Sequence, residues 1–171
     1  MEIKIRNAVP EDATAIQQII AIGYKRSFAK LHTNEYLESK IQEYLSPAKI
    51  EKLANVIRDK NSINIVTENA DGKIVGFVGG IRDKNNDWQL ITLYVDESVI
   101  GDIKFALSLV KEFSQRVKNN GANKFTTGTL TGSRVYKLYE LLGGKKIREF
   151  INKKRDSVSE TEFEFNVDKF I

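Results

Sequence analysis

The fold of this chain is decided between Trp88 and Phe113, where the sequence reads WQLITLYVDESVIGDIKFALSLVKEF. Residues Leu90–Val95 are Leu, Ile, Thr, Tyr and Val only, which predicts a central strand buried on both faces. A break at Asp96–Gly101 ends the strand. Apolar residues then recur at three- and four-residue steps, which predicts one amphipathic helix: Ile103, Ala106, Leu107, Val110, Phe113 and Val117. Strand, short loop and helix in this order direct backbone N–H groups and a positive helix end at a phosphate.

Length and composition narrow the class of protein. A chain of 171 residues is expected to form a single domain over residues 1–171. No apolar run approaches the roughly 20 residues that span a bilayer, and the N-terminus has no signal-peptide core, so we expect a cytoplasmic protein with no membrane partner. With no cysteine and one histidine, His32, we expect no metal site. The net charge of +4 suits an anionic cofactor but is too small to indicate nucleic acid.

The remaining segments alternate between strand and helix patterns. We expect further strands at Glu2–Arg6, Ser62–Thr67, Lys73–Ile81, Lys124–Leu130, Lys145–Lys154 and Glu160–Val167, and helices from Ala13, over Thr33–Leu45 and Pro47–Arg58, and from Ser133. The turn Asn69–Gly72 is typical of a hairpin, so the strands on either side of it and the central strand form an antiparallel meander. Three glycines in one of these strands, Gly76, Gly79 and Gly80, indicate a bulge or a close backbone approach.

Three segments of this chain resemble the GNAT family of N-acetyltransferases. The first is Leu93–Asp96 followed by Gly101 and a helix. The second is Ile5–Ile16, which combines a strand, a Pro/acidic turn and a helix. The third, and the most specific, is Ser133–Gly143, which matches the family's Tyr-Glu-x-x-Gly run at the end of a helix. The resemblance implies an α/β (α+β) fold: a mostly antiparallel mixed sheet of about seven strands, flanked by helices and splayed at one parallel pair.

The same resemblance implies a function and a set of site residues. The family uses acetyl-CoA as co-substrate and moves its acetyl group to a primary amine of a small molecule or peptide by direct attack. Tyr139 falls on the family's tyrosine, often the general acid. The resemblance assigns the cofactor to nine residues: Leu93, Tyr94 and Val95 on the central strand, Gly101, Asp102, Ile103 and Lys104 after it, and Ser133 and Tyr136 on the later helix.

The chain departs from the family in the phosphate-binding loop, which usually reads Arg/Gln-x-x-Gly-x-Gly/Ala. Here only Gly101 remains, and Ile100 stands in the place of the basic residue. An alternative is therefore an inactive domain of this fold that binds a ligand or partner. No general base is assigned, and His32 is expected to be an exposed histidine at a helix end. Pairing of edge strands into a homodimer is left open.

Two further groups of residues have alternative interpretations. The aromatic residues between Gly23 and Lys60 pack in the core or form a wall of the acceptor site: Tyr24, Phe28, His32, Tyr36 and Tyr44. The basic residues between Lys145 and Arg155 form a solvated strand pair rather than a nucleic-acid surface, since no exposed aromatic residues are interleaved with them.

Overall fold

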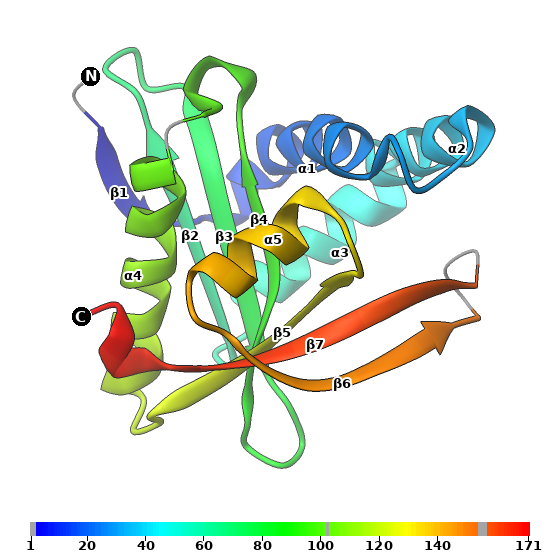
Figure 1. The fold of residues 1–171 in the computed structure, drawn as a ribbon. Helices are drawn as coiled ribbons and strands as arrows, with labels where there is room; N and C mark the ends of the chain where they lie inside the picture. The colour runs from blue at the N-terminus through cyan, green and yellow to red at the C-terminus, as the bar shows by residue number, and fades with distance from the viewer. Residues whose placement is uncertain (1–2, 102, 154–156) are drawn as a thin grey trace.

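A seven-stranded sheet runs through the part of the protein that the structure describes, in the order β1-β2-β3-β4-β5-β7-β6. The structure is a computed structural model and describes residues 3–101, 103–153 and 157–171 (Figure 1). Every neighbouring pair is antiparallel except β4 and β5, which are parallel. This is the mixed, mostly antiparallel sheet that the sequence predicts.

The elements follow one another nearly as expected. The strands are β1 (Lys4–Asn7), β2 (Ser62–Glu68), β3 (Ile74–Arg82), β4 (Trp88–Val95), β5 (Lys124–Leu130), β6 (Lys145–Asn152) and β7 (Val158–Asn166). The helices are α1 (Ala13–Phe28), α2 (Asn34–Tyr44), α3 (Pro47–Arg58), α4 (Ile103–Asn119) and α5 (Arg134–Leu141). None of the helices formed by these described residues has the length and apolar character needed to cross a membrane. Lys154, the last residue of a predicted strand, and Arg155, the last of the basic residues considered above, lie outside the described residues.

Helices cover both faces of the sheet (Figure 1). On one face α4 places Phe113 and Leu109 against Val78 and its neighbours in the main core. On the other face α1 places Ile16 against strand residues that include Phe77 in a second core. The two faces share strands because successive side chains of a strand point to opposite sides.

Local capping signals place the helix ends. Ser46 is the N-cap of α3, with Pro47 at the first helical position, and its Oγ accepts a hydrogen bond from the Lys49 N–H at 3.4 Å. Gly121 follows α4 with φ +82°, a left-handed conformation that favours glycine. Gly72 turns the β2–β3 hairpin with φ +75°. The predicted helix Pro47–Arg58 and the predicted turn Asn69–Gly72 are confirmed.

Three expectations about burial are wrong. The central strand is buried at Trp88 and Leu90, but Ile91 is 58% exposed and the residues after it are only half-buried. The helical spacing of Val135, Leu138, Leu141 and Leu142 predicts that all four face the core, but Leu141 is 80% exposed, because Tyr139 takes the buried position. His32 is not exposed: it is 9% accessible and its ring lies 4.4 Å from that of Tyr36.

The aromatic residues near His32 form a core. Tyr24 and Phe28 are buried, and their ring centroids lie 4.7 Å apart in an edge-to-face contact. Leu37 and Leu130 complete this cluster. Tyr24 and Phe28 therefore belong to the core, as the first of the two interpretations has it. Tyr44 also lines a cavity described below.

Candidate active site

The two parallel strands at the centre of the sheet separate after three residue pairs. Trp88 pairs with Phe125, Gln89 with Thr126 and Leu90 with Thr127. Strand β4 then continues to Val95 and β5 to Leu130 without pairing to each other. We call this divergence the wedge. It explains why the second half of β4 is not buried: the neighbour that would cover its edge has turned away.

A β-bulge lies where the wedge begins. Gly79 of β3 faces Thr92 of β4, and Gly80 faces Leu90, so Ile91 is an extra residue with no partner in either register. Gly80 is required here, because a Cβ at this position would lie 2.5 Å from the Gln89 carbonyl oxygen. The glycines of β3 indicated a bulge, but the extra residue on β4 was not foreseen. Bulges re-aim backbone and side-chain groups and are frequent at active sites.

Tyr139 lies at the apex of the wedge. It is 4% exposed, and its Oη lies 3.3 Å from the Thr127 Oγ1, which in turn lies 2.9 Å from the Leu90 carbonyl oxygen. Thr127 has one hydroxyl proton and the carbonyl can only accept, so Thr127 donates to Leu90 and Tyr139 donates to Thr127. The chain of hydrogen bonds ends on the last pair before the strands separate.

The charge state of Tyr139 suits an acid. Burial raises the pKa of its hydroxyl. The phenol is therefore protonated throughout the neutral range and holds a proton that it can donate. Its ring is fixed by edge-to-face contacts with Phe163 and Phe165, with centroids 5.7 and 5.8 Å away.

The motif that Ser133–Gly143 resembles usually continues with an aromatic residue, and this chain has Gly144 there. The same contacts explain the glycine physically. A Cβ at this position would lie 2.6 Å from the Phe165 ring and 3.0 Å from the Phe163 ring. Two phenylalanines from β7 therefore fill the space, and the departure at residue 144 leaves the packing of Tyr139 intact.

The loop between β4 and α4 is a tight turn with few positive groups. Gly101 has φ +89°, which favours glycine, and the Ile103 N–H already contacts the Gly101 carbonyl oxygen at 3.2 Å. The Asp96 carboxylate accepts hydrogen bonds from the backbone N–H and hydroxyl of Ser98. Lys104 is exposed at the start of α4. Asp102, also predicted for the cofactor site, lies outside the described residues.

A cationic pocket of about 440 Å³ lies on the opposite side of the wedge, between the end of α1 and the start of α5. Four of the residues that line it are basic: Arg26, Lys30, Arg134 and Lys137. Ser133 lies in the same wall as the N-cap of α5, where its Oγ accepts from the Tyr136 N–H at 3.0 Å. We call this the α1–α5 pocket.

Arg26 connects the α1–α5 pocket to the wedge. Its Nη2 donates to the carbonyl oxygen of Val95, the last residue of β4, at 3.1 Å. Its Nη1 is buried without a hydrogen-bond partner in the described part of the chain. Burial lowers the pKa of Arg26, and Arg134 lowers it further while Glu97 opposes the effect. An arginine stays charged even so, which leaves a half-buried cation in need of an anion.

The remaining predicted site residues are spread over both sides of β4. Leu93 and Val95 pack against the main core, whereas the Tyr94 ring packs against Gly23 of α1 so closely that a Cβ there would lie 2.4 Å from it. Tyr136 lies against Phe163, with ring centroids 5.5 Å apart, and the Lys146 amine lies 4.9 Å from the centre of the Tyr136 ring.

Sequence reasoning missed Arg26 and Arg134. Arg134 follows the predicted cap Ser133 directly, and its place in the first turn of a helix was the available signal. Arg26 gave none, because its contact with Val95 joins residues far apart in the chain.

Two more cavities meet at Ile91. One of about 490 Å³ lies under α1 and α3 and is lined on the sheet by residues that include Gly79, Ile91 and Thr92; we call it the α3 cavity. The other, of about 190 Å³, is lined by residues of β4, β5, β6 and β7, among them Leu90 and Thr127. Both reach the point where β4 and β5 separate.

Comparison with known proteins agrees with this geometry. No family model matches the sequence. The spermidine N(1)-acetyltransferase of Thermoplasma acidophilum is 26% identical over 123 residues, which are 71% of this chain and 74% of that protein. The crystal structure of the PaiA N-acetyltransferase from Thermoplasma acidophilum in complex with coenzyme A superposes with a TM-score of 0.75 at 22% identity, over 96% of this chain and all of that chain. The chain therefore has the fold of these N-acetyltransferases and resembles them in sequence.

A second acetyltransferase structure supports the fold. Aminoglycoside 6'-acetyltransferase type Ii superposes with a TM-score of 0.68 at 18% identity, over 96% of this chain and 97% of that chain. The splayed mixed sheet predicted from the sequence is confirmed. The curated relative and both structures are acetyltransferases by name, in agreement with the enzyme class that the sequence predicts.

Proposed function

We propose that this chain is a GNAT N-acetyltransferase that acetylates a primary amine of a small molecule or protein by direct attack on acetyl-CoA, with Tyr139 as the general acid. The observation that carries the proposal is the hydroxyl of Tyr139, held through Thr127 at the residue pair where β4 and β5 separate. A thioester placed in the wedge has its sulfur near this hydroxyl, because the wedge narrows to that point.

The proposed reaction uses the groups around the apex. The amine nitrogen attacks the thioester carbon, and the carbonyl oxygen gains negative charge that a backbone N–H near the Ile91 bulge can stabilise. The C–S bond then breaks, the N–C bond remains, and the thiolate takes the Tyr139 proton. The nitrogen loses its own proton to water, since no side chain is assigned as the base. Tyr139 recovers a proton from solvent through the same opening.

The phosphates of acetyl-CoA have two candidate sites. The backbone at Gly101, Asp102 and Ile103, with Lys104, is the site that the family resemblance implies. We propose that Arg26 and Arg134 of the α1–α5 pocket contribute most of the charge, because the loop itself carries Asp96 and Glu97. The unpartnered Arg26 Nη1 supports this assignment. Leu93, Tyr94 and Val95 then supply main-chain groups along the pantetheine arm, with Ser133 and Tyr136 on the facing helix.

Titration calorimetry separates this proposal from its alternative, an inactive domain that binds another ligand. We expect heat of binding with both acetyl-CoA and desulfo-CoA, and release of free thiol when an amine is added to the acetyl-CoA complex. Absence of binding at millimolar acetyl-CoA contradicts the enzyme and favours the inactive domain. Binding without thiol release for any amine of a broad panel places the chain among ligand-binding domains of this fold.

A further inference from the structure

We propose that the α3 cavity binds the acetyl acceptor, and that this acceptor is a primary amine that also carries an anionic group rather than a polyamine. The inference rests on the proposed acetyl transfer and names its substrate class. The curated relative is a spermidine N(1)-acetyltransferase by name, and spermidine is a polycation. The charged residues around the cavity of this chain instead favour an acceptor that carries a negative group.

The α3 cavity is placed to deliver an amine to the apex of the wedge. Ile91, the extra residue of the bulge, and Thr92 line it. Ile91 also lines the smaller cavity that holds Leu90 and Thr127, so an amine leaving the α3 cavity at Ile91 meets the residues that hold Tyr139. Its volume of about 490 Å³ is that of a small-molecule site.

One polar atom in this cavity lacks a partner. Gln17 of α1 is 6% exposed and lines the cavity. Its Nε2 donates to the Lys49 carbonyl oxygen at 3.2 Å, while its Oε1 is buried without a hydrogen bond in the described part of the chain. A buried amide oxygen left without a donor is unfavourable. The N–H of an amine acceptor is a donor of the required kind.

The charge of the cavity is positive. Lys49 and Lys52 line it, and among its described lining residues none is Asp or Glu. Lys49 pairs with Glu43 at 2.7 Å, but Lys40 pairs with the same carboxylate at 2.6 Å, so these three side chains together keep one positive charge. The two lysines lower the pKa of Glu43 to about 2, so this carboxylate is ionised at neutral pH. Its single negative charge neutralises only one of the two lysines.

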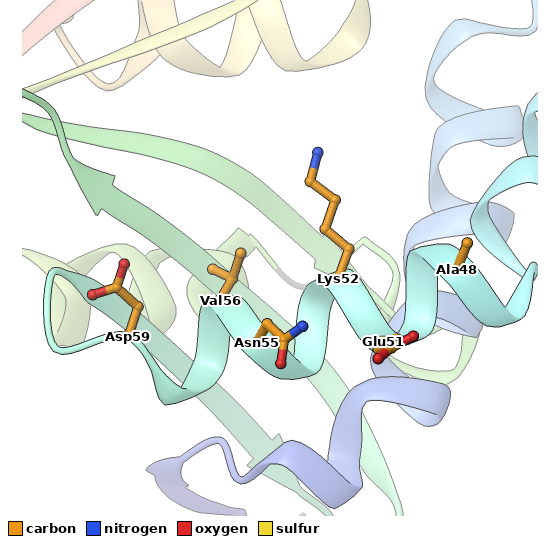
Figure 2. Close-up of a pocket in the computed structure, with 6 residues that line it drawn as sticks. All are labelled: Ala48, Glu51, Lys52, Asn55, Val56 and Asp59. Atoms are coloured by element: carbon orange, nitrogen blue, oxygen red, sulfur yellow. The ribbon is translucent and has the colours of Figure 1, made fainter.

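Lys52 adds a second positive charge. Figure 2 shows its amine extended away from the carboxylates of Glu51, on α3, and Asp59, the residue after α3. Those two carboxylates line an outer hollow on α3, which Lys52 also lines and which contains no residue of β4 among its described lining residues. A polyamine attracted to them therefore stays away from the bulge. An acceptor with a carboxylate or phosphate is attracted by Lys52 and Lys49 toward the α3 cavity itself.

A matched set of acceptors tests the inference. Three amines of equal chain length differ only at the far end: 4-aminobutanoate carries a carboxylate, 4-aminobutanamide is neutral, and butane-1,4-diamine carries a second ammonium. Acetylation is measured as thiol release from acetyl-CoA. We expect kcat/KM to fall in that order, with the carboxylate on the order of tenfold better than the diamine, because the lysine amines attract the carboxylate and repel the second ammonium.

Charge reversal gives the decisive variant. Lys52→Glu is expected to remove the preference for the carboxylate and to bring the diamine level with it or above it. Lys111→Glu changes the net charge equally on α4, which covers the other face of the sheet, and is expected to keep the wild-type order. Both lysines are exposed, so both variants are expected to fold. Gln17→Leu should raise KM for all three amines alike.

Two results overturn the inference. One is a wild-type enzyme that prefers the diamine, and the other is a Lys52→Glu variant that keeps the wild-type order. In either case acetylation itself is observed, so the proposed transferase function stands. Failure of the proposed function gives a different result: no thiol release with any of the three amines.

Discussion

The two sides of the wedge differ in the kind of group that they offer to a cofactor. On the loop side, residues 96–101 form a tight turn with two carboxylates, Asp96 and Glu97. Asp96 pairs with Lys73 at 3.1 Å, and Lys104 follows in α4. On the α5 side, Arg26, Lys30, Arg134 and Lys137 surround one pocket, and none of its described lining residues is acidic. Most of the positive charge therefore lies across the opening from the backbone turn, on side chains from α1 and α5.

The comparison teaches how a phosphate site can change within a fold. A glycine-rich loop binds phosphate through backbone N–H groups, which depend on local conformation. Arginine side chains bind it through charge and paired donors and can reach from distant elements. In the proposed arginine site, Asp96 and Glu97 of the loop do not have to contact the phosphates.

The largest effect is expected on the α5 side, at Tyr139. Tyr139→Phe removes the acid and is expected to lower kcat about 100-fold, a typical loss for a proton donor. The unfolding free energy is expected to fall by only about 1 kcal/mol, the value of one hydrogen bond. Steady-state kinetics and urea unfolding measure the two quantities. Unchanged kcat with normal stability shows that the hydroxyl only supports Thr127.

The raised pKa of Tyr139 also predicts a pH dependence of stability. In the unfolded chain a tyrosine titrates near pH 10, and burial moves the value in the folded protein higher. The folded state then holds the proton more tightly, so this contribution is complete below pH 10 and disappears as the pH rises through the folded pKa. Urea unfolding at pH 8 and pH 11 is expected to show a larger alkaline loss for the wild type than for Tyr139→Phe; equal losses contradict the assignment.

Neutralising one side of the wedge at a time is expected to give the next largest effect. Arg26→Gln and Arg134→Gln should each raise the Kd for coenzyme A about tenfold, since a hydrogen bond to a charged group contributes about 1.5 kcal/mol or more. Lys104→Gln, on the loop side, is expected to change it by less than about threefold, as for other exposed charges. Calorimetry gives the Kd values, and Lys111→Gln serves as the distant control. A larger effect at Lys104 places the phosphates in the loop.

The smallest effects are expected at two matched glycines, one on each side. Gly101 and Gly132 have φ of +89° and +79°, and a Cβ at either would meet no atom within 4 Å. Alanine at either position is expected to cost about 1 kcal/mol of unfolding free energy through backbone strain alone. Gly132→Ala, beside Ser133 and Arg134, should raise the Kd for coenzyme A about threefold, and Gly101→Ala less. Equal shifts in Kd remove the distinction between the two sides.

The sequence predicts those features that depend on a few neighbouring residues. Ser46 with Pro47, Gly72 and Gly121 mark turns and caps through their own conformational preferences, and the alternation of Phe163 and Phe165 places both in the core. The candidate role of Tyr139 came from the resemblance of the whole segment Ser133–Gly143 to the GNAT motif, because a single tyrosine does not indicate a function.

Other features depend on contacts across the fold. Residues 88–95 have strand composition throughout, so nothing in them indicates that pairing with β5 stops at Leu90. The exposure of Ile91 follows from that separation. The contact of Arg26 with Val95 likewise requires α1 to end beside β4, which local sequence does not specify.

The short register between β4 and β5 has a consequence for the mechanics of the whole molecule. Three residue pairs are the direct link between a four-stranded half and a three-stranded half of the sheet. Coenzyme A bound in the wedge is expected to contact both halves and to restrict their motion relative to each other. Amide hydrogen exchange in Gly128–Leu130 is therefore expected to slow when coenzyme A binds, by more than in the fully flanked β3.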